Sequence, residues 1–139
     1  MSNEEEFNLR LLEVFRTEAR EHRREIISAL RELEKGMDPE HQVDAIEKSF
    51  RAAHTLKGAA RAVNKSQIAA LCQSLEGIFL LLRDGQGRPG SEMFGALYHA
   101  VDSIEKLEEG SGDEDSEAIS RLNDVRRVLQ LPGKETADG

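Results

Sequence analysis

The chain has 139 residues, of which 38% are hydrophobic, 33% charged and 4% aromatic, and its formal net charge is −8. A chain of this length is typically one domain that buries a core without disulfides or metals. The acidic balance argues against sequence-independent binding to nucleic acids and against docking on anionic membranes, because both need a basic surface, and it is compatible with a protein partner.

Apolar residues recur at the helical period along the chain, and the strand period of two nowhere persists. The first predicted helix runs from about Glu4 to Lys35, with Ser2 or Asn3 as its cap and Gly36 at its end. Three glutamates in its first turn favour the positive end of the helix dipole. Its expected core-facing residues are Phe7, Leu11, Val14, Phe15, Ile26, Leu30 and Leu33.

The second predicted helix begins with Asp38 as cap and Pro39 at the first helical position, and it ends near Val63 and Asn64. Its expected inner face consists of Val43, Ile46, Phe50, Ala53 and Leu56. The third predicted helix is capped by Ser66 and ends at the glycines of 85–87. Its expected core residues are Ile68, Leu71, Cys72, Leu75, Ile78, Phe79 and Leu82.

The fourth predicted helix follows Pro89 and starts as late as Ser91. Its residues at helical spacing are Met93, Leu97, Val101, Ile104 and Leu107. A polar loop, 110–115, separates it from a fifth predicted helix over 116–131, which Pro132 stops. The residues of the fifth helix that we expect to face inward are Ile119, Leu122, Val125 and Val128.

Short connections make consecutive helices antiparallel neighbours, so the first four helices can close a bundle. We therefore predict an all-α fold, an antiparallel four-helix bundle with an additional C-terminal fifth helix. The expected domain covers residues 1–131, and residues 132–139 are expected to be a linker stub.

Cysteine usage and the absence of targeting segments predict a cytoplasmic protein. Cys72 is the single cysteine, so no internal disulfide can form, and a reducing compartment fits. The sequence has no run of about 18 apolar residues that could span a membrane. The acidic segment Met1–Glu6 has no apolar stretch, so we do not expect a secretory signal.

The stretch from Phe50 to Ala60 holds the residues with the most chemistry. On a helix, five of its polar or small residues share one side, because residues three and four apart are neighbours. These residues are Arg51, His54, Lys57, Gly58 and Arg61. The pattern predicts an exposed imidazole in a small basic patch on a rigid element.

Each of these residue types has a chemical use. Neutral imidazole is a good nucleophile near pH 7, so His54 is a candidate nucleophile. Lys57 offers a mobile positive charge for phosphoryl oxygens. Glycine inside a helix lowers its stability by about 1 kcal/mol relative to alanine, so the presence of Gly58 needs an explanation. Close approach of a partner to the helix at this position is one explanation.

The segment Ala53-His54-Thr55-Leu56-Lys57-Gly58 matches the signature of histidine phosphotransfer domains. With Phe50-Arg51-Ala52 before it, the segment resembles the amino-terminal phosphotransfer domain of chemotaxis histidine kinases of the CheA class. Phe15–Ala19 resembles the first-helix pattern of that domain, and Leu71–Glu76 resembles its third-helix pattern. The resemblance covers roughly residues 7 to 130.

The resemblance implies that His54 is phosphorylated, that Lys57 is its neighbouring lysine and that Glu76 accepts a hydrogen bond from His54 Nδ1–H. Such a bond fixes the tautomer and leaves the Nε2 lone pair free to attack the γ-phosphorus of ATP. Chemotaxis relatives often have a second histidine where this chain has Gln73. The amide can keep an auxiliary hydrogen bond, but a titrating group is lost.

The resemblance further implies a phosphoryl carrier that is not itself an enzyme. A separate histidine kinase domain, which binds ATP and Mg, phosphorylates His54, and the group passes to an aspartate of a response regulator. This domain would then need no cofactor, would be a monomer in isolation and would belong to a CheA-type kinase. The residues expected to contact partners are Phe50, Arg51, Gly58, Arg61 and Gln73.

Each of several predicted site residues also has a less specific interpretation. Arg51 can simply pair with Glu47 one turn earlier, which we favour, while Lys57 and Arg61 can be solvated cations. Gly58 can be a packing glycine, and Glu76 can be a plain surface acid.

Two other function classes are alternatives to the phosphoryl carrier. An interaction or adaptor bundle fits the helical periods equally well, but it does not need the residues around His54. A di-iron enzyme needs Glu-x-x-His pairs, whereas Glu18 and His22 are four apart. His22, His41 and His99 show no ligand spacing, so no metal is expected.

Overall fold

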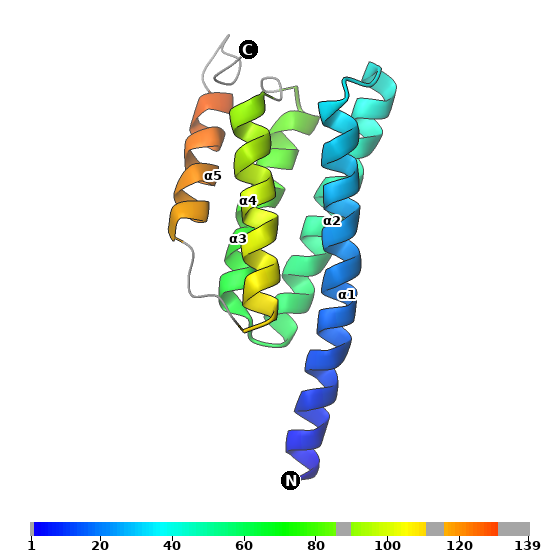
Figure 1. The fold of residues 1–139 in the computed structure, drawn as a ribbon, viewed down its shortest axis with the longest axis vertical. Coiled ribbons are helices and arrows are strands. Elements are labelled where there is room, and N and C mark those ends of the chain that lie inside the picture. The colour runs from blue at the N-terminus through cyan, green and yellow to red at the C-terminus, as the bar shows by residue number, and fades with distance from the viewer. Residues whose placement is uncertain (1, 86–89, 111–115, 131–139) are drawn as a thin grey trace.

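The computed structural model describes residues 2–85, 90–110 and 116–130. Within these ranges the regular structure is entirely helical, which confirms the predicted fold class (Figure 1). The helices are α1 (Asn3–Glu34), α2 (Pro39–Ala62), α3 (Ser66–Arg83), α4 (Ser91–Glu108) and α5 (Ser116–Leu129).

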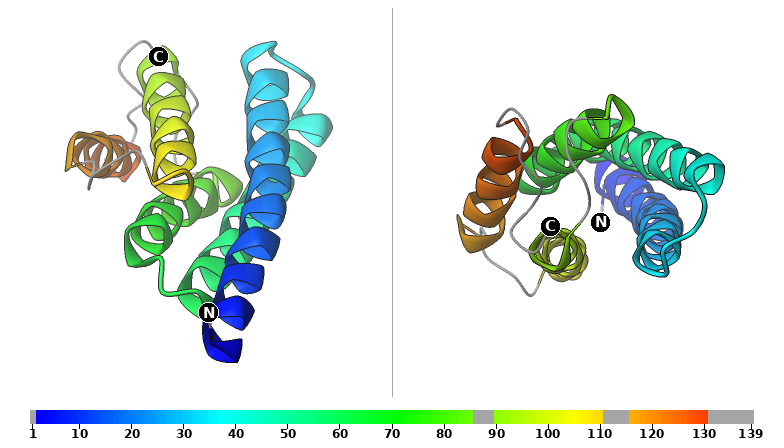
Figure 2. Two further views of the ribbon diagram at one scale, coloured as in Figure 1. Left: turned by 60° about the horizontal axis from the view of Figure 1, so that its bottom comes forward. Right: turned by 90° about the horizontal axis from the view of Figure 1, so that it is seen from above.

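Helices α1 to α4 form a closed ring, in which α1 packs against α2 and α4, and α3 packs against the same two helices. Helix α5 lies outside this ring, against α3 and α4 (Figure 2). The arrangement is the predicted four-helix bundle with an additional fifth helix. None of the helices in the described part of the chain is long and apolar enough to cross a bilayer.

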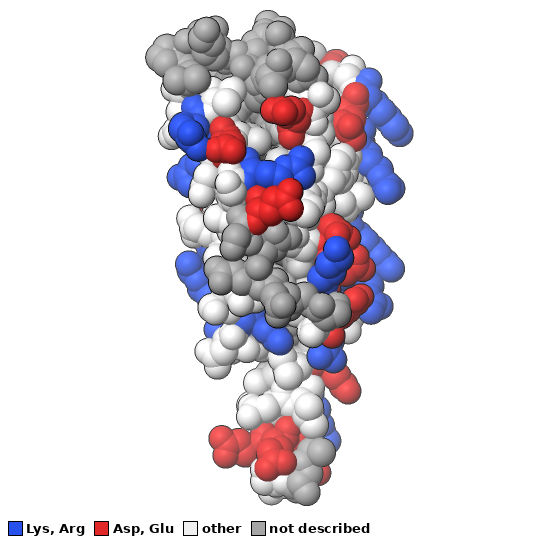
Figure 3. Space-filling view, turned by 60° about the vertical axis from the view of Figure 1, so that its left-hand side comes forward, with Lys and Arg blue, Asp and Glu red and all other residues white. Residues whose placement is uncertain are grey.

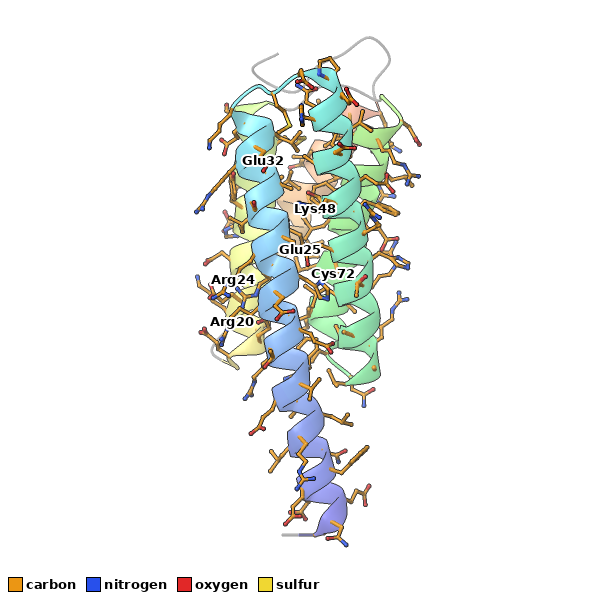
Figure 4. All side chains as sticks on the ribbon, turned by 90° about the vertical axis from the view of Figure 1, so that its right-hand side faces the viewer. Arg20, Arg24, Glu25, Glu32, Lys48 and Cys72 are labelled. Atoms are coloured by element: carbon orange, nitrogen blue, oxygen red, sulfur yellow. The ribbon has the colours of Figure 1, made fainter. Side chains whose placement is uncertain are left out.

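Helix α1 starts at a serine cap, because the Ser2 side chain accepts a hydrogen bond from the Glu5 backbone N–H at 3.1 Å. The expected core position of three of its residues is wrong. Phe7 is 61% exposed, Val14 is 54% exposed and Leu11 is 39% exposed. The 32-residue helix is longer than its neighbours, so its first turns extend past the bundle and no other described helix covers them (Figure 4).

Helix α2 begins as predicted, with Asp38 accepting a hydrogen bond from the His41 backbone N–H at 3.0 Å. Val43 is 57% exposed, so its expected place on the inner face is wrong. The buried face of this helix is built mainly of small residues, which let α1 and α3 approach closely. They are Ala45, Ser49, Ala52, Ala53 and Ala60.

Helix α3 is not capped by Ser66 as predicted. Ser66 is already helical, and the cap position is Lys65, whose side chain makes no capping hydrogen bond. Asn64 with its φ of 61° turns the chain tightly, and the Lys65 N–H bonds back to the Ala60 carbonyl at 2.8 Å. All seven predicted core residues of this helix are buried, among them Cys72.

Helices α4 and α5 place most predicted residues inside. The five predicted core residues of α4 are buried. In α5, Leu122 and Val125 are buried, whereas Ile119 and Val128 are only partly buried. Ala118 and Leu129 complete its inner face instead, because α5 leans on two helices rather than one.

Several predicted features fall on residues that the structure does not describe. The polar loop lies mostly in 111–115, and the linker stub lies in 131–139; both are outside the described residues. So are Pro89 and the last two residues of the 85–87 segment. The division into residues 1–131 and 132–139 therefore stays a prediction.

Candidate functional site

His54 lies in the middle of α2, and its side chain is 62% exposed. Its Nδ1 is 3.2 Å from Glu76 Oε2 on α3. The structure thus places the predicted imidazole and carboxylate together across the seam between two helices. Among the described residues Nε2 has no hydrogen-bond partner, so this nitrogen is open to an incoming group.

The ionisation of Glu76 decides where the imidazole proton sits. Burial by itself raises the pKa of the Glu76 carboxyl, but the hydrogen bonds from Lys57 and His54 and the positive charge of Lys57 outweigh burial and lower the pKa below its ordinary value of 4.5. An ionised carboxylate can only accept hydrogen bonds. His54 therefore donates from Nδ1–H, and the lone pair of the neutral ring is on Nε2.

Lys57 is not the mobile surface cation that we expected. Its side chain is only 10% exposed, and its Nζ lies 2.7 Å from Glu76 Oε2. Nζ also donates a hydrogen bond to Gln73 Oε1 at 3.1 Å. The lysine faces α3, where two acceptors satisfy it, so it acts on the site through the carboxylate. The amide of Gln73 keeps an auxiliary hydrogen bond, as expected for that position.

The polar contacts between α2 and α3 follow one antiparallel register. His54 contacts Glu76, and Lys57, three residues further along α2, contacts Gln73, three residues back along α3. The same register brings Glu47 to Arg83, whose Nη1 lies 3.6 Å from Glu47 Oε2. The predicted pair of Arg51 with Glu47 is therefore wrong, because the carboxylate turns across the interface instead of along its own helix.

Phe50 and Arg83 add a stacked arrangement to the site. The rings of Phe50 and His54 have centroids 6.3 Å apart and are nearly parallel, with 12° between their planes. The Arg83 guanidinium carbon lies 4.8 Å from the centroid of the Phe50 ring. Arg83 was not among the residues predicted for the site from the sequence. A usable signal was its position seven residues, or two helical turns, after Glu76.

Three further predicted residues lie around this cluster without joining it. Gly58 is exposed, and a Cβ added there would meet nothing within 4 Å, so the structure does not support a packing role for it. Arg51 and Arg61 are exposed, and neither has an ion pair in the described part of the chain. These residues form the open surface beside His54 on α2.

The described residues outside this site show neither a cluster of metal-ligating side chains nor a reactive thiol. Across residues 2–85, 90–110 and 116–130, no group of three or more His, Cys, Asp or Glu side chains could hold a metal ion. Cys72 is fully buried, and burial raises the pKa of its thiol to about 12. A protonated core thiol is a poor nucleophile, so Cys72 acts as a core residue.

Comparison with known proteins gives a consistent family. A sequence model of the family described as "Hpt domain" matches residues 10–109. The chemotaxis protein CheA of Halobacterium salinarum is 33% identical over 121 residues, which cover 85% of this chain and 18% of the relative. CheA of Bacillus subtilis is 32% identical over 119 residues, which cover 82% of this chain and 17% of the relative.

A third relative, CheA of Borreliella burgdorferi, is 29% identical over 70 residues, which cover 50% of this chain and 8% of the relative. The chain therefore spans less than a fifth of the length of these relatives. No solved structure matches the chain.

Proposed function

This chain belongs to the Hpt domain family, and we propose that His54 is the residue on which it carries a phosphoryl group in two-component signalling. One observation supports this assignment above the others. An exposed imidazole is hydrogen-bonded at Nδ1 to an ionised carboxylate of the neighbouring helix, which leaves Nε2 as the nucleophile. A passive helical bundle has no need for such an arrangement.

The first step of the proposed cycle is phosphorylation by a separate histidine kinase domain that holds ATP and Mg²⁺. The Nε2 lone pair of His54 attacks the γ-phosphorus. A nitrogen–phosphorus bond forms while the bond from the γ-phosphorus to its bridging oxygen breaks, and ADP leaves with that electron pair. The ring becomes positively charged because Nδ1 keeps its proton. The negative charge of Glu76 then stabilises the cationic ring.

The second step passes the group to an aspartate of a response regulator. A carboxylate oxygen of that aspartate attacks phosphorus, and the nitrogen–phosphorus bond breaks with its electron pair returning to Nε2. His54 is again neutral with its proton on Nδ1, so the Glu76 hydrogen bond can persist through both steps. No proton has to enter or leave the site, and the chain itself needs no cofactor.

The surface around His54 suits docking of these partners. Gly58 leaves open space one turn after the imidazole, and Arg51 and Arg61 add exposed positive charge. Such charge complements the acidic groups and phosphates of a kinase or regulator active site. We propose these residues as partner contacts, together with Phe50 and with Gln73 on α3.

The setting of the domain is also part of the proposal. The relatives are chemotaxis proteins of the CheA type, and this chain matches less than a fifth of each. We infer that the chain is the phosphotransfer domain of a chemotaxis histidine kinase, that it is a monomer by itself and that it works in the cytoplasm.

The test is phosphorylation by the ATP-binding domain of a chemotaxis histidine kinase with [γ-³²P]ATP. The wild-type chain should take up an acid-labile label that a receiver domain removes, and His54→Gln should take up none. His41→Gln is the matched control, since His41 lies exposed on the same helix. A label that persists in His54→Gln, or signalling that survives this change, would refute the proposal and favour an adaptor bundle.

A further inference from the structure

The His54 ring has a second neighbour besides Glu76, which is the aromatic ring of Phe50 one turn earlier on α2. The two ring centroids are 6.3 Å apart with 12° between the planes, which lies within the usual range for offset stacking. A hydrogen bond at Nδ1 alone lets an exposed imidazole tilt about that nitrogen. The parallel contact restricts the tilt, so the two contacts together set the direction of Nε2.

Phe50 needs support of its own, because it is only partly buried. Its ring lies 4.8 Å from the Arg83 guanidinium carbon, inside the distance of about 6 Å at which a cation is attracted to an aromatic face. Arg83 in turn lies 3.6 Å from the Glu47 carboxylate, and it is partly exposed. A side chain of α3, tethered by a carboxylate of α2, thus holds the ring that contacts His54.

The two helices supply these groups at matching intervals. On α3, Glu76 and Arg83 are seven residues apart and share one face. On α2, Glu47, Phe50 and His54 lie at spacings of three and four, which also place them on one face. Helix α3 therefore holds the imidazole twice, directly through Glu76 and indirectly through Arg83.

We propose that Arg83 and Phe50 are positioning residues for phosphoryl transfer at His54. Arg83 holds the Phe50 ring, and the Phe50 ring holds the plane of the imidazole; neither touches the phosphoryl group. This inference rests on the proposed function of His54. The competing role for Arg83 is that of a docking cation for the partner, which predicts different kinetics.

The kinetic test measures kcat and KM for labelling of the full chain by a kinase ATP-binding domain. Arg83→Gln should lower kcat by about 3- to 10-fold, the rate equivalent of one lost stacking contact, with KM changed less than twofold. Phe50→Leu should lower kcat by the same factor, and it should also raise KM because Phe50 is a proposed partner contact as well. Phe50→Tyr keeps the ring and should restore kcat. Arg127→Gln is the matched control, because Arg127 forms a surface ion pair with Asp124 on α5, away from the site.

The structural readout is the NMR spectrum of the His54 imidazole. Loss of the Phe50 ring current should shift its ring protons in Phe50→Leu, and Arg83→Gln should shift them in the same direction, with the Nδ1–H tautomer unchanged in both. A raised KM with unchanged kcat in Arg83→Gln would assign docking to Arg83, and unchanged kcat and spectra would refute positioning. An unlabelled wild-type chain would instead refute the proposed function itself.

Discussion

At the scale of single residues, the site depends on one carboxylate oxygen that serves two donors. Glu76 Oε2 lies 2.7 Å from Lys57 Nζ and 3.2 Å from His54 Nδ1. The lysine keeps the carboxylate ionised, and the ionised carboxylate sets the imidazole tautomer. The burial of Lys57 is thus coupled to the chemistry of His54 although the two side chains do not share a bond.

A single variant and a double variant test this coupling. In Glu76→Gln the buried ammonium of Lys57 loses its counter-charge, so the free energy of unfolding should fall by about 3 kcal/mol. Combining it with Lys57→Met should recover at least half of that loss, because the orphaned charge is removed. Urea denaturation measures the free energy of unfolding of both variants. Asp102→Asn, in an exposed pair with Lys106, should cost no more than about 1 kcal/mol.

Glu76→Gln should also slow phosphorylation. An amide cannot hold the imidazole as a carboxylate does, so the labelling rate of Glu76→Gln should fall by about 10- to 100-fold, as when other residues that orient a histidine are replaced. A rate within twofold of wild type would contradict the role of Glu76 as the tether of His54.

The lowered pKa of Glu76 also predicts how stability depends on pH. Its ionised form is favoured in the folded state, so this contribution is fully present above the ordinary value of 4.5 and is lost as pH falls through the lower folded value. The stability gap between wild type and Glu76→Gln should therefore shrink as pH falls from about 5 to below about 4.5. Glu108 is present in both chains, so its titration does not distinguish them; a gap that widens below about pH 5 would contradict the prediction.

At the scale of single helices, substitution of Gly58 should affect stability and partner binding in opposite directions. Alanine is a better helix former, and its Cβ would meet nothing within 4 Å, so Gly58→Ala should raise the free energy of unfolding by about 0.5–1 kcal/mol. If partners approach closely here, the same change should raise KM for the kinase domain. Thermal unfolding and labelling kinetics measure the two effects.

Gly36 provides the matched comparison for that prediction. It ends α1 with a φ of 73°, in the left-handed region that favours glycine. Gly36→Ala should therefore lower the free energy of unfolding, with the opposite sign to Gly58→Ala. Equal signs in the two variants would show that local backbone geometry does not govern these positions.

At the scale of the whole molecule, two kinds of contact join the helices in addition to the apolar core. Arg23 of α1 donates two hydrogen bonds to the buried Glu108 carboxylate of α4, at 2.7 and 2.8 Å. On the outer side, arginines of α5 lie over glycines of the ring, at 3.3 Å from a Cβ added to Gly77 and 3.1 Å from one added to Gly95. Figure 3 shows acidic and basic side chains interspersed on this face.

Removal of α5 should leave the phosphotransfer site working. The Hpt match ends at residue 109, and α1 to α4 already form a closed ring. A chain ending at Gly110 should lose a few kcal/mol of stability. This is about what burial of the leucines and valine of α5 contributes after the conformational entropy lost by ordering that helix is subtracted. It should keep its helical circular dichroism and near wild-type labelling of His54. A chain ending at Gln130 is the control, and an unfolded shorter chain would show that the ring needs α5.

The sequence alone determined the five helices to within about two residues, the all-α bundle and the pairing of His54 with Glu76, the last through family resemblance. Caps, glycines and apolar periods are local signals, so they mark where a helix begins and ends. The tertiary structure decided that Phe7 and Val14 remain uncovered and that Lys57 is buried. It also decided that Glu47 meets Arg83, because helix lengths and interhelical register, which no single segment encodes, choose the partners across an interface.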